Sequence, residues 1–246
     1  MKLFLDDHRF IDTEEGIDLS ISLSNDEQNP RAWYVDKPRF EPVRANGFLG
    51  SVAEGGNVNF RDIFFNPHGH GTHTECLGHI TEEVYNINDS LKTFFFQAIL
   101  ITLRPEKRGE DLVISKKQLE DALDGRSCEA LIVRTLPNEK GKLHRDYSNT
   151  NPPYFDPEGV QVLDQAGVKH LLVDLPSVDR EEDGGTLIFH HTFWKVPEAP
   201  RFDRTITELI YVNDYVVDGA YILNLQISSF KNDASPSKPI LYKITS

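Results

Sequence analysis

Three short apolar runs place the tightest limit on what this 246-residue chain can fold into. They cover residues 94–103, 130–135 and 170–174, and such runs are typical of strands buried on both faces of a sheet. Segments with helical spacing separate them. The order strand, helix, strand, helix, strand predicts an α/β fold.

The two intervening helices carry recognisable end signals. Ser115 can cap a helix over 116–123, where apolar residues recur at helical spacing, and Gly125 can end it. The second helix is expected to begin at Asp156-Pro157-Glu158 and to end at Gly167, just before the third apolar run. Both helices therefore fit between consecutive strands.

Further strands are expected on either side of this unit. Residues 17–23 alternate between apolar and polar side chains, and residues 205–212, 220–227 and 240–244 also have strand composition. These strands favour a mixed sheet with helices over a barrel of regular βα units. No internal repeat or low-complexity linker divides the chain, so we expect a single domain over residues 1–246.

Charge and composition limit the partners. The chain has 26 Lys and Arg against 39 Asp and Glu, a net charge of −13, which disfavours nucleic acid and anionic membrane surfaces. The N-terminus lacks the apolar stretch of a signal peptide, and no run is long enough to span a bilayer. Only Cys76 and Cys128 are present, so we expect a reducing compartment, the cytoplasm. The expected partner is a small-molecule substrate.

Four of the nine histidines fall within residues 68–79, which read His-Gly-His-Gly-Thr-His-Thr-Glu-Cys-Leu-Gly-His. Imidazole and carboxylate groups are the ligands expected for zinc or manganese, and a catalytic site leaves one position open for water. Glycines within the segment permit a tight turn. His73 and Glu75 share one face if the segment is extended, and His79 lies one helical turn beyond Glu75.

The stretch from Gly71 to His79 resembles the signature of the metal-dependent cyclase family, which includes bacterial kynurenine formamidases and isatin hydrolases. The usual form is His-x-Gly-Thr-His-x-Asp-x-Pro-x-His. Three more segments are similar to family motifs, so the resemblance spans nearly the whole chain: Asp18-Leu19-Ser20, Leu131 to Thr135, and Asp174 to Asp179. It implies a cyclase-like fold of the swivelling β/β/α type, assembled as a homodimer or tetramer.

The first histidine of the motif is shifted here. Gly69 stands at the family's position, between His68 and His70. We favour His68 as the metal ligand because it follows the apolar segment 63–65, and His70 is the alternative. Glu75 replaces the family's Asp and still offers a carboxylate that could bridge two metals.

The resemblance implies further ligands far along the chain. His191 and Glu208 are similar to the family's distant histidine and glutamate, with His190 as the alternative to His191. The large apolar Trp194 three residues after His191 favours that choice. Glu208 lies in an apolar strand, where a buried carboxylate is costly unless a cation pairs with it.

The activity implied by the resemblance is metal-dependent hydrolysis of an amide, formamide or lactam bond, like that of the arylformamidase of tryptophan catabolism. The cofactor would be Zn²⁺ or Mn²⁺, one or two ions per subunit, held by His68, His73, Glu75, His191 and Glu208. His79 would act as the catalytic proton carrier. The alternatives are a metal-stabilised binding protein without catalysis, and a metal-dependent cyclase or dehydratase.

Overall fold

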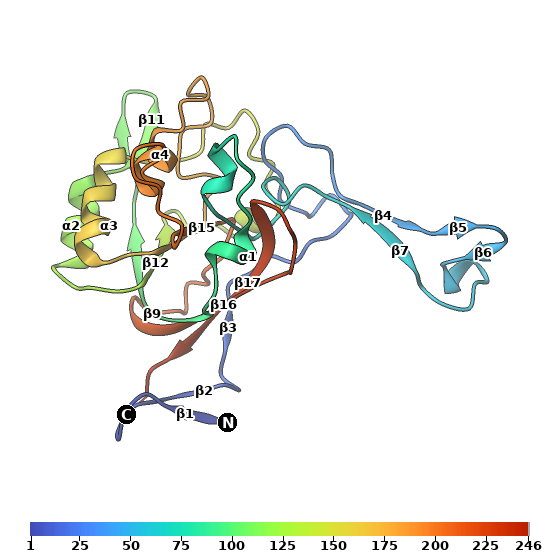
Figure 1. The fold of residues 1–246 in the computed structure, drawn as a ribbon, viewed down its shortest axis with the longest axis horizontal. Coiled ribbons are helices and arrows are strands. Elements are labelled where there is room, and N and C mark those ends of the chain that lie inside the picture. The colour runs from blue at the N-terminus through green and yellow to red at the C-terminus, as the bar shows by residue number, and fades with distance from the viewer. Residues whose placement is uncertain (246) are drawn as a thin grey trace.

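The computed structural model describes residues 1–245, and an eight-stranded mixed sheet forms its centre (Figure 1). Four neighbouring strands, β9, β12, β14 and β15, are parallel to one another, and the rest pair antiparallel. In spatial order the strands are β16 (Gly219–Ile227), β9 (Phe95–Leu103), β12 (Ala130–Thr135), β14 (His170–Val173), β15 (Thr205–Glu208), β8 (His73–Glu75), β17 (Ala234–Lys243) and β3 (Ile17–Asp18).

Strand β17 closes this sheet into a barrel. Its residues 234–236 pair with β8, and its residues 237–243 pair with β16 at the other end of the strand order. The seven strands from β16 to β17 therefore form a continuous ring. Strand β3 is not part of the ring and, within the described residues, pairs only with β17.

Two predicted strands are shorter than the sequence pattern indicates. The strand expected over 17–23 pairs only at Ile17 and Asp18, because the Ile21 amide donates to the Thr72 hydroxyl instead of to a neighbouring strand. The strand expected over 205–212 ends at Glu208, because Leu209 has a φ of 53° that a strand cannot accommodate.

The predicted helices α2 (Lys116–Leu123) and α3 (Val160–Ala166) are present, and they lie together beside the parallel strands (Figure 1). Ser115 caps α2 in a reciprocal arrangement with Gln118, as the sequence signal suggested. A short 3-10 turn over Pro157–Gly159 precedes α3. Two helices were not predicted, α1 (Ile87–Ser90) and α4 (Ile188–Trp194).

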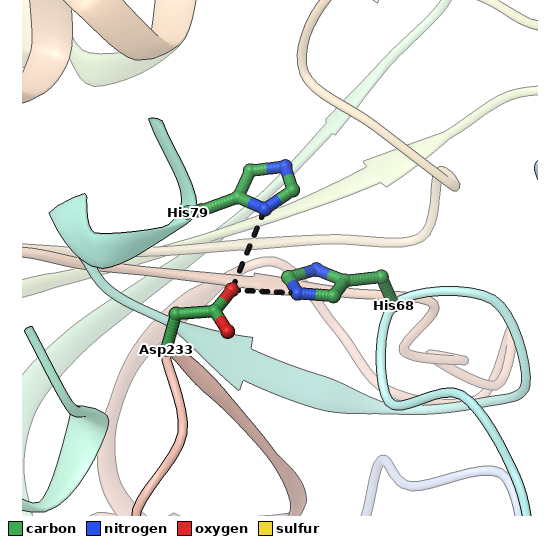
Figure 2. A group of neighbouring side chains, drawn as sticks. All are labelled: His68, His79 and Asp233. Atoms are coloured by element: carbon green, nitrogen blue, oxygen red, sulfur yellow. Dashed lines mark hydrogen bonds and ion pairs between the residues drawn. The ribbon is translucent and has the colours of Figure 1, made fainter. Parts of the chain in front are cut away.

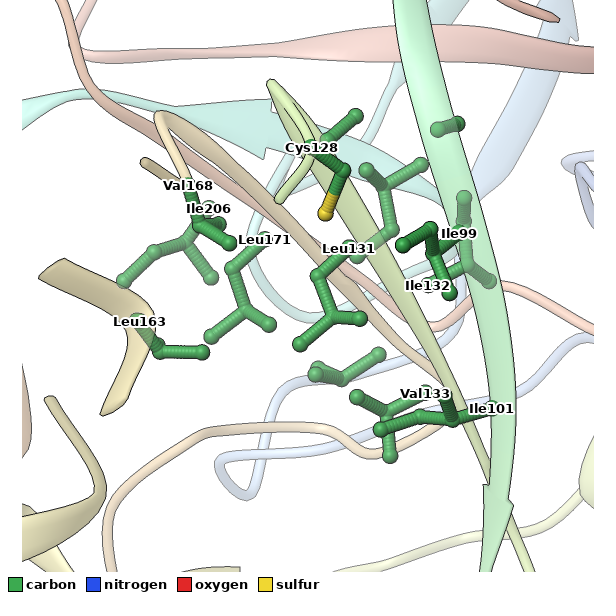
Figure 3. Close-up of a cluster of buried hydrophobic side chains, with 14 of the residues drawn as sticks. Ile99, Ile101, Cys128, Leu131, Ile132, Val133, Leu163, Val168, Leu171 and Ile206 are labelled. Carbon is green, nitrogen blue, oxygen red and sulfur yellow. The ribbon is translucent and has the colours of Figure 1, made fainter. Parts of the chain in front are cut away.

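The apolar core lies between the parallel strands and these helices. Figure 3 shows Leu131 and Leu171 from neighbouring strands beside Leu163 of α3, and all three side chains are fully buried. Burying each such side chain contributes roughly 1.5–3 kcal/mol. The three apolar runs of the sequence therefore form the buried centre of the fold, and the loops extend from it.

A ribbon-like arm extends from the body toward the right of Figure 1. It consists of β4 (Arg39–Pro42) paired with β7 (Arg61–Phe64), and β5 (Arg44–Ala45) paired with β6 (Phe48–Leu49), with a 3-10 turn over Val52–Glu54. Several large apolar side chains along it are exposed.

The remaining elements are small. A hairpin of β1 (Lys2–Phe4) and β2 (Phe10–Asp12) lies near both termini, and β10 (Glu106–Arg108), β11 (Asp111–Ile114) and β13 (Tyr154–Phe155) form a separate three-stranded sheet (Figure 1). Single 3-10 turns cover Leu77–Ile80 and Lys140–Leu143. Within residues 1–245, no helix combines the length and the hydrophobicity needed to cross a membrane.

Candidate metal centre

The centre of the site is strand β8, which runs between β15 and β17 and is buried along its whole length. Side chains alternate along a strand, so His73 and Glu75 point to the same face. Glu208 of β15 is the direct cross-strand partner of His73, and its side chain lies on that face too. Two distant segments thus bring one imidazole and two carboxylates together.

Two buried polar atoms of these groups face other site residues at ion-pair distance without a hydrogen bond to any described residue. His73 Nε2 and Glu75 Oε2 are both inaccessible to solvent and make no hydrogen bond within the described residues. His73 Nε2 lies 3.4 Å from Glu208 Oε2. An unpaired buried polar atom costs free energy, so the arrangement fits a cation that would bind these atoms.

His68 and His190 complete the group from two other directions. His68 follows the arm, and its Nδ1 lies 3.0 Å from Glu75 Oε2. His190 comes from α4, and its Nε2 lies 3.0 Å from Glu75 Oε1. Glu75 is therefore positioned between the two histidines, as a carboxylate shared by two metal positions would be.

Each of the three histidines is held by its other ring nitrogen. His73 Nδ1 is 2.9 Å from the Gly71 carbonyl oxygen, His68 Nε2 is 2.8 Å from Asp233 Oδ2, and His190 Nδ1 is 2.6 Å from Asp179 Oδ2. Metal-binding histidines have this arrangement, because the outer acceptor fixes the tautomer and leaves the inner nitrogen free. The donor set thus fits a divalent metal ion.

His191 was expected to be a metal ligand, but the structure places its side chain outside the group. His191 lies one residue beyond His190 on α4, and its Nδ1 contacts the Val196 carbonyl oxygen at 3.1 Å, outside the group. One residue corresponds to about 100° of rotation around a helix, so neighbouring side chains cannot face the same point. His190, the alternative from sequence, is the residue that contacts Glu75.

The structure also distinguishes the two candidates for the first histidine of the motif. His68 reaches the group, whereas His70 is held elsewhere: its Nδ1 accepts from the Asn66 amide, and its Nε2 contacts the Asp36 carbonyl oxygen. His68 therefore takes the place that sequence favoured.

His79 lies at the edge of the group, with a ring nitrogen within 4.8 Å of the ligand atoms of Glu75 and His190 in one set and of His68 and Asp233 in another. It is on the 3-10 turn Leu77–Ile80, its side chain is 30% exposed, and its Nε2 lies 3.9 Å from Glu75 Oε2. Figure 2 shows Asp233 contacting both His79 and His68. Sequence reasoning missed Asp233, because a lone Asp before a strand has no spacing relationship to the histidine window.

Known proteins are similar to this chain over most of its length. Residues 17–180 match the family model described as a putative cyclase. The chain belongs to the cyclase family. A kynurenine formamidase of Bacillus thuringiensis (strain Al Hakam) is 28% identical over 235 residues, covering 94% of this chain and 99% of that protein. The corresponding enzyme of Bacillus anthracis is 27% identical over the same length.

Solved structures show the same fold. An isatin hydrolase bound to the product analogue thioisatinate superimposes with a TM-score of 0.68 at 13% identity, covering 93% of this chain and 92% of that one. A predicted metal-dependent hydrolase from Bacillus stearothermophilus gives a TM-score of 0.63 at 16% identity, covering 93% and 98%. The α/β class and the mixed sheet expected from sequence are thus confirmed for this cyclase-family chain.

The electrostatics of this cyclase-family site favour positive charge. Burial alone would lower the pKa of His68, but Asp233 and Glu75 outweigh it and raise that pKa to about 10. His190 behaves alike: against its burial, Asp179 and Glu75 raise its pKa to about 10. Protons on these imidazoles balance the surrounding carboxylates in the metal-free protein, and a bound cation would replace them.

A cavity of about 410 Å³ opens beside the centre. His68, His79 and His190 form its polar floor, and Trp33 and Leu187 contribute apolar walls. Ser177 and the loop from Arg180 to Gly185 line its remaining sides. In this cyclase-family chain, a small molecule in the cavity would lie against His79 and the proposed metal ligands.

Proposed function

We propose that this chain is a metal-dependent hydrolase of a non-peptide C–N bond in an amide, formamide or lactam. The observation that carries the proposal is the buried convergence of His73 Nε2 and Glu75 Oε2, which make no hydrogen bond in the described part of the chain, with the imidazole of His68 and the carboxylate of Glu208. This group lies next to a cavity that contains a partly exposed histidine. The relatives named kynurenine formamidase and the structural likeness to an isatin hydrolase support the same class of reaction.

Zn²⁺ or Mn²⁺ is the proposed cofactor, with one or two ions per subunit. When bound, such an ion polarises a carbonyl oxygen and makes water more acidic. The five residues that would hold it combine imidazole and carboxylate donors on converging elements: His68, His73, Glu75, His190 and Glu208.

His79 is the proposed proton carrier. Its ring is accessible from the cavity, and its Nε2 faces the metal centre without contacting it as closely as His68 or His190 does. As the oxygen of water adds to the substrate carbonyl carbon, His79 takes the proton from that water. When the C–N bond breaks, His79 returns the proton to the leaving nitrogen.

The substrate is proposed to be a small aryl formamide or a related lactam. The cavity is large enough for a single aromatic molecule, and Trp33 offers an aromatic surface for stacking. N-formylkynurenine is therefore the first substrate to test.

We also propose that the chain forms a homo-oligomer of two or four copies. The arm exposes roughly half of each of Phe48, Phe60, Ile63 and Phe64. A two-stranded ribbon has little stability of its own, and a second copy would bury this surface. Sedimentation analysis of Phe60→Asp tests this: the variant is expected to be monomeric, and an unchanged sedimentation coefficient contradicts a role for the arm.

The cytoplasm is the proposed location, since both cysteines, Cys76 and Cys128, are buried free thiols. The net charge of −13 continues to favour a small-molecule partner over nucleic acid or a membrane surface.

The test of the proposed hydrolysis compares wild type with His79→Ala. Metal content is measured by plasma mass spectrometry, and N-formylkynurenine hydrolysis is followed in the same samples. We expect bound metal in both proteins and turnover lower by about 10²–10⁴-fold in the variant. Metal without turnover in wild type, across aryl formamides and lactams, would contradict the hydrolase function, and absence of metal after reconstitution would contradict the site.

A further inference from the structure

The carboxylate of Asp233 lies between two histidines that have different roles in the proposed function. One oxygen, Oδ2, is 2.8 Å from His68 Nε2 and 3.5 Å from His79 Nδ1 (Figure 2). The two imidazole rings stack with their centroids 4.2 Å apart. A single carboxylate oxygen thus faces both a proposed metal ligand and the proposed proton carrier.

The backbone fixes Asp233 in this place. Its carbonyl oxygen accepts a hydrogen bond of 3.0 Å from the Cys76 amide, and the next residue, Ala234, pairs with Glu75 at the start of β17. The close packing of Asp233 against the turn that carries His79 also depends on Gly78. A Cβ added there would lie 3.1 Å from Asp233 Cβ and 2.2 Å from the Tyr85 carbonyl oxygen. The position of the carboxylate is therefore set by the barrel and not by a flexible loop.

The two contacts select one nitrogen on each ring. In the neutral form of His68 that would bind a metal, Nε2–H donates to Asp233, so Nδ1 is unprotonated and faces Glu75. Asp233 Oδ2 also lies 3.5 Å from Nδ1 of His79, so a proton on that nitrogen faces the carboxylate, and Nε2 lies on the side of Glu75. Asp179 resembles Asp233 in the first respect only, because it contacts His190 and not His79.

We propose that Asp233 is a positioning residue that couples the metal centre to the proton carrier. It orients His68 for metal binding, and it keeps Nε2 of His79 available for the proton of the attacking water. This inference rests on the proposed function, and it predicts two separable effects of removing the negative charge at Asp233: one on metal binding and one on turnover.

The first experiment measures metal affinity in Asp233→Asn and Asp179→Asn by competition with a chelator. Loss of an outer partner of a metal-binding histidine costs roughly 10–100-fold in affinity, and we expect this loss in both variants. The visible absorption spectrum of the Co²⁺-loaded proteins gives a second readout, and it is expected to change in both. Unchanged affinity and spectrum in Asp233→Asn would overturn the role of Asp233 toward His68.

The second experiment measures kcat and KM for N-formylkynurenine at saturating Zn²⁺. For Asp233→Asn we expect kcat at roughly a tenth of wild type or less, with KM changed by less than about twofold. The loss of kcat is expected to exceed that of Asp179→Asn, because only Asp233 faces His79. Equal kcat values in the two variants would overturn the coupling to His79.

Two further proteins keep these results interpretable. Asp121→Asn changes an exposed carboxylate of α2 that pairs with Lys117. This control is expected to match wild type in metal affinity and in kcat. Asp233→Glu restores the charge, and it is expected to recover part of the kcat that Asp233→Asn loses. A kcat of Asp233→Glu no higher than that of Asp233→Asn contradicts a role for the charge. A wild-type protein that binds Zn²⁺ without hydrolysing the substrate contradicts the proposed function instead, and the affinity comparison then still decides whether Asp233 supports the centre.

Discussion

His73 and Glu208 lie directly opposite each other on the antiparallel strands β8 and β15, and His73 Nε2 is 3.4 Å from Glu208 Oε2. The strand register alone brings these residues together, although they are far apart in the sequence. Both side chains are almost completely buried. A carboxylate and an imidazole in this position are held in place before any ligand arrives, so the site requires little reorganisation to bind a cation.

The first prediction concerns this pair. His73→Ala removes a nitrogen, Nε2, that makes no hydrogen bond within residues 1–245, so metal affinity is expected to fall by more than the roughly 10–100-fold typical of outer-shell partners. Plasma mass spectrometry of the purified protein measures the bound metal. His144→Ala, at an exposed histidine, is the control and is expected to retain full occupancy. Equal metal content in the two variants would remove His73 from the site.

A second prediction separates the two neighbouring histidines of α4. His190→Ala is expected to lose bound metal and turnover, because His190 Nε2 faces Glu75. His191→Ala is expected to keep the metal, because its Nδ1 contacts the Val196 carbonyl oxygen, away from Glu75. Isothermal titration with Zn²⁺ compares the two proteins directly. The opposite result would restore the assignment of His191 that the sequence favoured.

A third prediction is a pH dependence of stability from His170, which is remote from the metal centre. Burial lowers its pKa to about 4, with Lys169 adding to the effect and Asp203 opposing it. The unfolded chain has the ordinary value of about 6.5, so it binds more protons between these two pH values. The stability that depends on His170 remaining neutral is thus complete above about pH 6.5. As the pH falls toward 4, the free energy of unfolding decreases by up to roughly 3 kcal/mol.

Urea unfolding of the metal-free protein at pH 7 and pH 5 measures this effect. His170→Leu keeps an apolar contact with Phe96 and cannot titrate, so its stability is expected to fall less between the two pH values than that of wild type. The titrating groups of the metal centre are the same in both proteins and cancel in the comparison. An equal fall in the two proteins would show that His170 is not protonated on unfolding in this range.

A fourth prediction concerns Asp174, which the family motif includes but the metal centre does not. Its carboxylate accepts hydrogen bonds from the Thr135 amide and hydroxyl and from Lys142 Nζ, the last at 2.7 Å, and Lys142 and Asp174 are both buried. Lys142→Met leaves this carboxylate unpaired and is expected to cost about 3–5 kcal/mol of unfolding free energy.

Denaturant unfolding of Lys142→Met and of the double variant Lys142→Met/Asp174→Asn tests this pair. The second substitution removes the unpaired charge, so the double variant is expected to be more stable than the single one. If the double variant is the less stable of the two, Asp174 has partners that matter more than Lys142.

The parallel centre of the fold was predictable because it depends on local patterns. The apolar runs around Leu131 and Leu171 are continuous, and Ser115 marks the start of α2 within one residue. Closure of the barrel was not predictable. It depends on β17 pairing with β8 and β16 at once, and nothing in the composition of that segment distinguishes a strand with two successive partners from an ordinary edge strand.

The site divides in the same way. His73, Glu75 and His79 lie in one window, where spacing on a strand and the following turn is enough to bring them together. His191 was preferred to His190 because of the position of Trp194, and the helix that would have decided between the two histidines was not predicted. A residue's direction on a helix depends on where the helix starts, and α4 begins after Leu187, whose φ of 42° has no sequence signal.

Strand β17 has a consequence for how the protein is made. A ribosome synthesises the chain from its N-terminus, so β8 and β16 have both left the exit tunnel before β17 can join them. Until then β8, with His73 and Glu75, lacks one neighbour, and Asp233 has not reached His68. The surroundings of the proposed centre are therefore complete only once β17 has been synthesised and has paired with β8.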